Sequence, residues 1–390
     1  MKLKYNWQHP DWPNFSYESA QTHEFVYQYV QKAGRLAGGI TQLKGTVQYD
    51  AYVDLMVSEA IYTSQIEGER LNHEDVRSSI KNFLGLNPQP VRVSNARAEG
   101  MAALMVDVRK TFTAPLTKEV LFHWHQLVFP VQESLISKPV LVGQWRTSQE
   151  PMQIVSGPIG YEKIHYEAPP AHIVGQEMTR FFNWYNQTNP LNNDAQKISG
   201  PVRAAIAHLW FETIHPFDDG NGRIGRAIAE HALAQDLGRP PLLSLSTIIE
   251  QDKKAYYAGL HEASTWHAEA ESLNINEWVN WFCRMVLTAQ NAAAKQVDHI
   301  LKRVKFLDHY QDQLSERQKK AIEKIFKAGP DGFEFGINAK KYMGLSGCSK
   351  ATATRDLASL VKKGCLIAIE TVGRNARYEL NLNEDDIFKF

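Results

Sequence analysis

Twelve consecutive residues near the middle of the chain combine side chains that suit phosphate chemistry. The segment from His215 to Arg226 reads HPFDDGNGRIGR. Its glycine turn lets the backbone approach a ligand closely, and the turn lies just before a predicted helix start, where unpaired N–H groups and the helix dipole favour an anion. Its two arginines carry guanidinium groups that match phosphate oxygens. The predicted anion-binding residues are Gly220, Asn221, Gly222, Arg223 and Arg226.

Two more residues of this segment add the remaining parts of an active site. Asp219 offers a hard oxygen ligand for Mg²⁺, an ion that keeps several waters and bridges to substrate phosphates. His215 suits a general base, because an ordinary histidine titrates near neutral pH. An anion cradle, a metal carboxylate and a base in one loop predict phosphoryl-type transfer by positioning and charge stabilisation.

Three other interpretations of the same segment fit less well. A calcium loop from Asp219 to Glu230 would place Arg223 at a ligand position and Ile224 where glycine is required. A phosphate-binding loop of the GxxxxGK[ST] type is absent from the sequence. A structural glycine turn beside a core histidine would explain either feature alone, but not the complete set.

The bulk composition describes an ordinary globular protein. The chain has 390 residues, enough for two or three domains, and 43 basic residues balance 43 acidic ones. Its three cysteines show no CxxC spacing and are predicted to be reduced thiols of a cytoplasmic protein. No signal peptide, transmembrane segment or other membrane contact is expected.

The hydrophobic pattern predicts a mainly α fold. Apolar residues recur at helical spacing from Thr46 to Ile66, and Gly68 supplies a stop. Met152–Glu167 differs, because two β-like runs flank a Gly/Pro turn and predict a hairpin. Further helices are expected over 72–84, 93–112, 117–129, 200–214 and 220–237, so that the central motif joins two helices.

The motif also carries a family resemblance. HPFDDGNGRIGR matches the signature HxFx[DE]GNGRxxR of the Fic family without departure, and residues 86–290 resemble the Fic core, including Gly143-Gln-Trp-Arg146. Fic enzymes mostly transfer AMP from ATP to protein hydroxyls. The resemblance implies that His215 deprotonates the target hydroxyl, that Asp219 holds Mg²⁺ and that the glycine turn and the two arginines bind the ATP phosphates.

The same resemblance gives roles to the hairpin and to a tyrosine pair. The hairpin 152–167 would be the flap that aligns the target protein by strand pairing. Val155, Ser156 and Gly157 of the flap are expected in the ATP site. Tyr256 and Tyr257 lie where some relatives place aromatic residues beside adenine, although a plain core pair is an equally good interpretation.

A second pattern predicts an internal inhibitor. Thr63–Gly68 reads TSQIEG and fits the family's inhibitory pattern [ST]xxxE[GN]. Glu67 lies at a predicted helix C-terminus, where the helix dipole disfavours negative charge, which hints at function. By resemblance, Glu67 would pair with Arg226 and fill the room that the γ-phosphate needs.

The end of the chain reads as a winged helix. Helices are expected over 314–328, 339–343 and 349–364, followed by strands over 365–371 and 376–380 that flank a wing at Gly373-Arg-Asn. The region from Glu316 to Glu379 holds 13 Lys and Arg against 7 Asp and Glu. This excess suits DNA contact through 349–377, and protein docking fits the region equally well.

Taken together, the sequence predicts three parts and one main function. The parts are an N-terminal helical region (1–86) with the inhibitory helix, a Fic catalytic core (87–290) and a winged-helix domain (291–390). The predicted function is an autoinhibited protein adenylyltransferase that uses Mg–ATP and releases pyrophosphate, with homodimers as a habit of the family. The alternative is a DNA-binding transcriptional regulator whose Fic core senses nucleotide.

Overall fold

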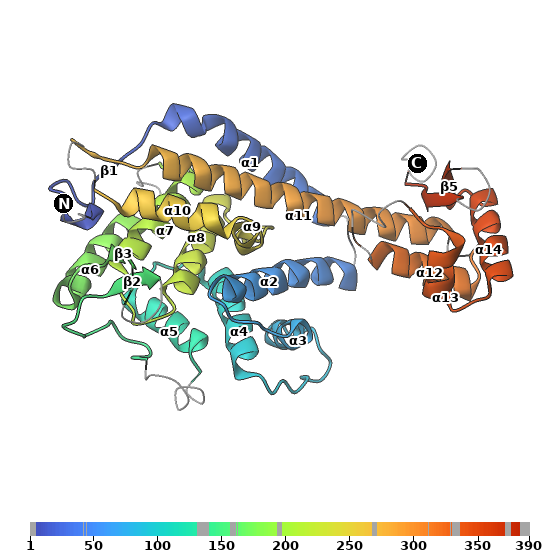
Figure 1. Ribbon diagram of the computed structural model, residues 1–390, viewed down its shortest axis with the longest axis horizontal. Helices are drawn as coiled ribbons and strands as arrows, with labels where there is room; N and C mark the ends of the chain where they lie inside the picture. Colours follow the sequence, from blue (N-terminus) through green and yellow to red (C-terminus); the bar gives the residue numbers. More distant parts are fainter. Residues whose placement is uncertain are drawn as a thin grey trace. The chain divides into compact units, whose positions relative to one another are not determined.

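The structure is a computed structural model that describes residues 5–41, 43, 45–130, 140–156, 161, 163–192, 197–266, 271–310, 312–327, 329, 336–370 and 376–382. The chain divides into two compact units, 1–37 with 45–293 (unit 1) and 38–44 with 294–390 (unit 2). The mainly α fold is confirmed (Figure 1). The division at residues 86 and 290 stays a prediction; residues on both sides of 86 belong to unit 1, and 290 lies within one continuous helix.

The first part of unit 1 leads from short N-terminal elements into five helices. Asparagine side chains cap the N-termini of two of these helices: Asn72 caps α3 and Asn95 caps α4. The predicted helix 46–66 is confirmed to the residue. The elements are η1 (Asn6–Gln8), β1 (Phe15–Ser16), α1 (Ser19–Thr41), α2 (Thr46–Ile66), α3 (His73–Phe83), α4 (Ala96–Thr111) and α5 (Lys118–Val128).

The second part of unit 1 contains the hairpin and the motif helices. The predicted hairpin is present as an antiparallel pair with an irregularity between Ile154 and Val155. The elements are β2 (Gln153–Ser156), β3 (Lys163–Glu167), α6 (Ala171–Gln187), α7 (Gly200–Ile214), α8 (Asn221–Leu237), α9 (Leu245–Gln251), α10 (Lys253–Ser264), β4 (Leu273–Asn274) and α11 (Asn276–Tyr310). Helix α11 contributes residues to both units.

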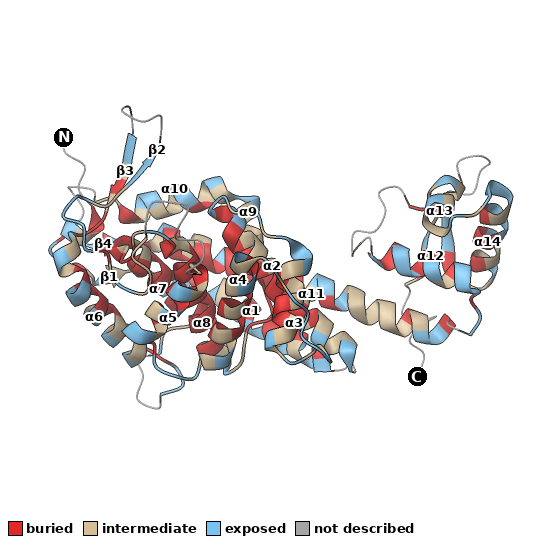
Figure 2. Ribbon diagram, turned by 90° about the horizontal axis from the view of Figure 1, so that it is seen from below, coloured by how far each residue is buried: buried red, intermediate tan, exposed pale blue. Residues whose placement is uncertain are grey.

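The core of unit 1 is built around α7 and α8. Every residue of α7 except Glu212 is buried, and α8 packs against α7 along its length (Figure 2). Helix α2 packs against α9, α3, α4 and α8. The hairpin β2–β3 projects from this core and is largely exposed in its first strand.

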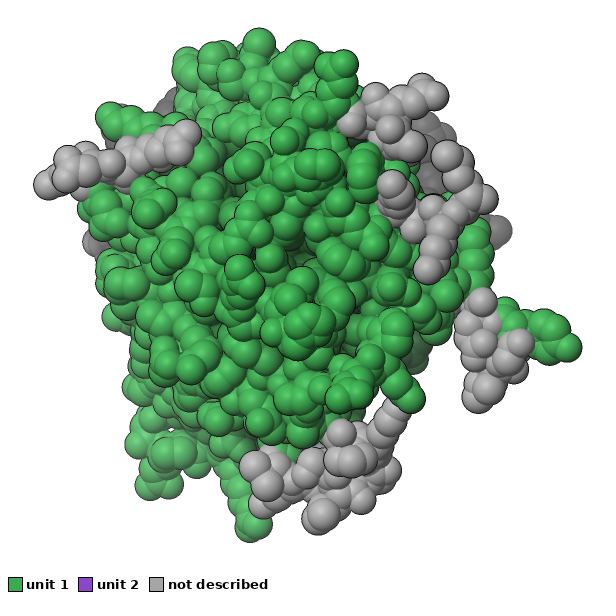
Figure 3. Space-filling model, turned by 90° about the vertical axis from the view of Figure 1, so that its left-hand side faces the viewer, with its two compact units in different colours: residues 1–37, 45–293 green, residues 38–44, 294–390 purple. Residues whose placement is uncertain are grey.

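The N-terminal segment is part of this unit. Strand β1 pairs in parallel with β4, and Asn6 donates hydrogen bonds to Thr213 Oγ1 (3.1 Å) and to the Ala263 carbonyl (3.2 Å). Trp12 donates to the buried Glu177 (2.7 Å). Trp12 also packs edge-on against Trp210 of α7, so the N-terminal segment belongs to the core of unit 1, the unit that Figure 3 shows in green.

Unit 2 has its own apolar core. It contains α12 (Glu316–Lys327), α13 (Ala339–Ser346), α14 (Lys350–Lys362) and the antiparallel strands β5 (Leu366–Glu370) and β6 (Arg377–Leu380). Ser349 caps α14, as predicted, and Ala353, Leu357 and Leu360 are buried. The winged-helix interpretation stays a prediction, and its wing at Gly373-Arg-Asn lies outside the described residues.

Candidate active site

His215 follows the last turn of α7 in an unusual backbone conformation. Its φ is +50°, in the left-handed region that residues other than glycine rarely adopt. Arg146 fixes this turn, because its Nε donates to the His215 carbonyl (2.8 Å) and its backbone N–H to the Pro216 carbonyl (2.9 Å). Arg146 also donates to the Ile214 carbonyl (3.3 Å) and to the Pro169 carbonyl. The structure thus gives Arg146 a positioning task.

The glycine turn is held by the side chain of Asn221. Its Oδ1 accepts from the Phe217 N–H (2.9 Å) and its Nδ2 donates to the Phe217 carbonyl (2.8 Å). Gly220 has a φ of +82°, and a Cβ there would lie 2.6 Å from the Phe129 ring. The Asn221 amide therefore braces the loop. Helix α8 begins without a side-chain cap, because its N-cap residue is Gly220.

Asp219 is exposed at the same turn. Its Oδ1 accepts from the Gly220 N–H (2.6 Å). Buried His125 contacts the Asp219 carbonyl through Nε2 (3.0 Å) and the Gly143 N–H through Nδ1 (3.0 Å), and it stacks on Phe217. His125, to which the sequence analysis gave no role, therefore positions the backbone of Asp219.

Glu67 lies at the N-terminal end of α8. Its Oε1 accepts from Arg226 (2.7 Å), and a Cβ added to Gly222 would lie 2.2 Å from that oxygen. Arg226 also donates to the side chain (2.7 Å) and the carbonyl (2.9 Å) of Thr63, one helical turn before Glu67. Thr63 and Glu67, the first and fifth residues of the TSQIEG pattern, thus both contact the last residue of the central motif.

Glu69 pairs with the other motif arginine. Arg223 is buried and donates to Glu69 Oε2 (2.7 Å), while Arg97 of α4 pairs with Glu69 Oε1. The Arg223 guanidinium also stacks over the Phe129 ring at 4.9 Å. Sequence reasoning gave Glu69 no role, and only its position two residues after Glu67 hinted at one.

A cavity of about 530 Å³ joins several predicted site residues. His215, Glu67 and Gly222 border one part of it, and Val155, Tyr256 and Tyr257 border another. Tyr256 is buried and bonded to His208 Nε2 (2.8 Å), whereas Tyr257 is 45% exposed. Of the tyrosine pair, Tyr257 therefore has the freer surface for a ligand.

Other predicted residues lie apart from this cavity. Asp219, Arg223 and Arg226 do not border the cavity in the described part of the chain. Ser156 ends β2 and pairs with Lys163. Gly157 lies outside the described residues.

Burial and charge set the protonation of the site. Burial lowers the pKa of His215 to about 4, so its imidazole is neutral at pH 7. Burial opposes ionisation of Glu67, but the charges of Arg226, Arg223 and Lys253 outweigh it and lower its pKa. The site therefore pairs a neutral histidine with an ionised internal carboxylate.

The described residues contain no cluster of three or more His, Cys, Asp or Glu side chains that could hold a metal. A single exposed carboxylate such as Asp219 still fits Mg²⁺, which binds through one or two carboxylates plus substrate phosphates. Among the described helices, none combines the length and apolar character needed to cross a bilayer.

Comparison with known proteins matches two parts of the chain to families. Residues 115–233 match the Fic/DOC family, and residues 5–86 match a domain of unknown function (DUF4172). The first range includes the central motif and is shorter than the expected core of 87–290. The second includes α2 and Glu67.

Curated relatives share part of their sequence with this chain. A probable protein adenylyltransferase of Aquifex aeolicus (aq_aa38) is 23% identical over 154 residues, which are 38% of this chain and 43% of the relative. Protein adenylyltransferase fic-1 of Caenorhabditis elegans is 25% identical over 208 residues, 52% of this chain and 35% of the relative. The chain thus spans less than half of the length of either relative.

A solved structure shares the fold. The crystal structure of a Fic family protein from Desulfovibrio desulfuricans aligns with a TM-score of 0.51 at 18% identity, covering 94% of this chain and 97% of that one. At this identity the likeness supports the fold alone. Together with the unbroken motif and the sequence match, it shows that the chain carries a Fic/DOC family domain over residues 115–233.

Proposed function

We propose that the chain is an autoinhibited protein adenylyltransferase, which transfers AMP from Mg–ATP to a Ser, Thr or Tyr hydroxyl of a target protein or of itself. The observation that carries the proposal is the Glu67 carboxylate, which lies beside Gly222 at the start of α8 and pairs with Arg226. The N-terminus of α8 and Arg226 already bind one negatively charged group, the Glu67 carboxylate. This supports a phosphate-binding site that a side chain of the same protein occupies. The names of the curated relatives support AMP as the transferred group.

The proposed chemistry follows from the charges at the motif. The target oxygen attacks the α-phosphorus, the bond to the β-phosphate oxygen breaks, and pyrophosphate leaves with the electron pair. Neutral His215 accepts the proton of the hydroxyl through Nε2, since its Nδ1 faces the Glu212 carbonyl at 3.3 Å. Arg223, Arg226 and the N–H groups at the start of α8 would hold the phosphates, and Asp219 would hold Mg²⁺, which neutralises their charge.

The proposed inhibition is steric and electrostatic. Glu67 occupies the position next to Gly222 and Arg226 that the γ-phosphate needs, so ATP would bind with its α-phosphate misplaced for attack. The target protein would pair with the exposed edge of β2, where Ile154 and Val155 are 43% and 46% exposed beside the cavity. The identity of the target, homodimer formation and a cytoplasmic location stay predictions.

The test is self-modification of the full chain with labelled Mg–ATP. Glu67→Gly is expected to raise the rate by about 5- to 150-fold, the usual range of coupling between two sites. Adding His215→Ala should then lower it by about 10²- to 10⁴-fold, because the base is gone. Glu74→Ala, an exposed carboxylate of α3, serves as the control. A Glu67→Gly protein no more active than wild type would refute the inhibition, and the mass of the adduct identifies the nucleotide.

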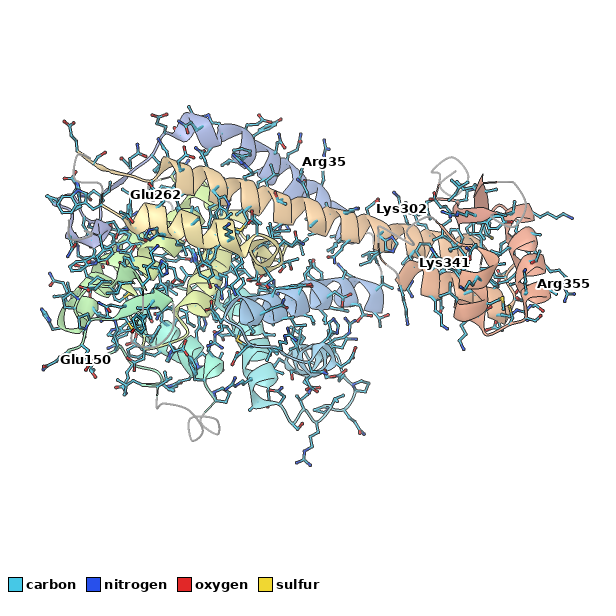
Figure 4. All side chains as sticks on the ribbon, in the orientation of Figure 1. Arg35, Glu150, Glu262, Lys302, Lys341 and Arg355 are labelled. Atoms are coloured by element: carbon cyan, nitrogen blue, oxygen red, sulfur yellow. The ribbon has the colours of Figure 1, made fainter. Side chains whose placement is uncertain are left out.

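We also propose DNA binding by unit 2 as a second candidate function. Lys350, Arg355 and Lys362 are exposed on α14, and Arg355 projects from that helix (Figure 4). The one acidic residue of α14, Asp356, is buried and neutralised by two bonds from Arg317 (2.7 and 3.0 Å). Only positive charge therefore remains exposed on this helix, which favours phosphates.

The two candidate functions give opposite results in one pair of measurements. An AMP adduct on protein incubated with Mg–ATP supports the enzyme. Salt-dependent binding to duplex DNA that changes with ATP and weakens in Lys350→Gln/Arg355→Gln, without any adduct, supports the regulator.

A further inference from the structure

Glu212 is the one residue of α7 that is not fully buried, and it borders the cavity that contains His215. It lies three residues before His215. Because the chain turns into the left-handed conformation at His215, the imidazole folds back over the last turn of α7. Its Nδ1 then lies 3.3 Å from the Glu212 carbonyl oxygen and 3.8 Å from the carboxylate oxygen Oε2. Both acceptors of Glu212 thus lie on the same side of the histidine ring.

The second carboxylate oxygen faces α8. A Cβ added to Gly225 would lie 2.4 Å from Glu212 Oε1 and 3.0 Å from His208 Nδ1, so the glycine at this motif position makes room for the carboxylate. Oε1 and His208 Nδ1 are both buried without a hydrogen-bond partner among the described residues. An unpaired buried polar atom lowers the free energy of unfolding by about 1–3 kcal/mol. Glu212 therefore destabilises the fold, which favours a functional role over a purely structural one.

The charged surroundings of Glu212 keep its carboxyl near a change of protonation. Burial raises its pKa to about 8, Arg226 opposes this shift, and Glu67 adds to it. The other titratable groups around it are His208, His215, Tyr256, Tyr257 and Tyr166. A carboxyl that titrates close to the working pH is suited to a part in proton transfer.

We propose that Glu212 is a positioning residue for His215, whose carboxylate orients the imidazole through Nδ1 and stabilises the imidazolium formed during transfer. This inference rests on the proposed function. The hydroxyl proton moves to His215 Nε2 as the bond from oxygen to the α-phosphorus forms and pyrophosphate leaves. The proton stays on the imidazolium beside the Glu212 carboxylate and passes to solvent after release. Burial lowers the pKa of His215 to about 4, and an ionised carboxylate beside Nδ1 would make the imidazole a stronger base.

Electrostatics also connects Glu212 to Glu67. The charge of Arg226 acts on both carboxylates, and the negative charge of Glu67 raises the pKa of Glu212. Removal of Glu67 therefore lowers the pH at which Glu212 ionises. Removal of Glu67 would thus both open the phosphate site and favour the ionised Glu212 that supports His215 as the base.

The kinetic test uses the full chain with Glu67→Gly and compares Glu212→Gln, Glu212→Asp and the exposed control Glu262→Gln across pH 6 to 9.5. We expect Glu212→Gln to lower kcat about tenfold or more with KM for ATP unchanged, and to remove a rise of rate with pH that the control retains. Glu212→Asp keeps a carboxylate and should retain part of that rise. An unchanged kcat and pH profile in Glu212→Gln would overturn the proposal.

A second test needs no activity and so separates this inference from the proposed function. Histidine-labelled NMR spectra of the wild-type chain should show a change in the His215 ring shifts near pH 8, where Glu212 ionises. The change should be lost in Glu212→Gln, whose remaining histidine signals report that it is folded. A wild-type His215 signal that shows no such change overturns the proposal, whether or not AMP transfer is found.

Discussion

Arg146 shows how one buried side chain can hold a catalytic loop. Within the described residues it has no carboxylate partner, and its guanidinium donates to the carbonyls of Ile214, His215 and Pro169. It therefore stabilises the left-handed turn at His215, a conformation that costs free energy by itself.

Replacement of Arg146 by lysine should destabilise unit 1. One ammonium group cannot reach all three carbonyls, so Arg146→Lys is expected to lower the free energy of unfolding by about 2–4 kcal/mol. Urea unfolding followed by tryptophan fluorescence measures it, because all nine tryptophans lie before residue 282. The exposed Arg35 (Figure 4) gives a control, for which Arg35→Lys should change the free energy by less than about 0.5 kcal/mol. Equal effects of the two substitutions would show that the hydrogen bonds from Arg146 to the three carbonyls do not stabilise unit 1.

The sequence could predict site residues that share one contiguous motif, but of the partners that are distant along the chain it indicated only Glu67 and Arg226, through the family resemblance. His215, Gly220 and Gly222 belong to one contiguous motif, so their types and spacing were enough. The partners of Arg146, His125 and Glu69 lie between 18 and 154 residues away. No local pattern records such pairs.

At the scale of elements, the connection between α2 and α3 covers both arginines of the motif. Glu67 pairs with Arg226, and Glu69 pairs with Arg223. Arg97 of α4 holds Glu69 from its other side. Displacement of this connection would free at once the two arginines that we propose as phosphate-binding groups.

Substitution of Glu69 should therefore release part of the inhibition. Glu69→Gln is expected to raise self-modification several-fold and to lower KM for ATP, because Arg223 loses its internal partner. Combined with Glu67→Gly it should exceed either single change, with Mg–ATP titrations as the measurement. Arg97→Gln leaves the pair of Glu69 and Arg223 in place and should not activate. Equal activation by both substitutions would mean that inhibition depends on a fixed conformation of the segment between α2 and α3, and not on the charge of Glu69.

Elements with a local sequence pattern could be predicted, whereas the pairing of β1 with β4 could not. Helix α2 has a clear period and a glycine stop, and it was predicted at Thr46–Ile66. The β1–β4 pair joins Phe15 to Leu273 through two residues on each side, too few to leave an alternating pattern. Helix α11 continues through the composition change near residue 290, because its apolar residues keep their spacing on both sides.

At the scale of the whole molecule, four histidines in the described part of unit 1 have pKa values well below the ordinary value. Burial lowers the pKa of His125, His208 and His215 to about 4 and that of His231 to about 3. The unfolded chain binds protons at these side chains below about pH 6.5, whereas the folded unit binds them only below these lower values. Acid therefore favours the unfolded state.

Unit 1 should accordingly lose stability between pH 7 and pH 5. Each buried histidine contributes a loss of about 2 kcal/mol over this range. Burial raises the pKa of Glu212 to about 8 and of Glu230 to about 7, and these two carboxyls act in the opposite direction by about 2.5 kcal/mol each. The expected net loss is about 3 kcal/mol, measured by urea unfolding at both pH values through tryptophan fluorescence.

A substitution of one buried histidine checks the cause of this loss. His231→Gln removes one of the four groups and should reduce the difference between pH 7 and pH 5. His73→Gln, in which an exposed histidine of α3 is replaced, should leave it unchanged. A stability that rises toward pH 5 would contradict the assignment.

The order of α2 and α8 along the chain matters when the protein is made. Glu67 precedes Arg226 by 159 residues, so the ribosome releases the proposed inhibitory helix well before the motif that it covers. When the glycine turn first emerges, its internal anion is already in the nascent chain. The newly synthesised protein would therefore be inhibited from the start, and the phosphate site would at no stage of synthesis be open to ATP without its inhibitor.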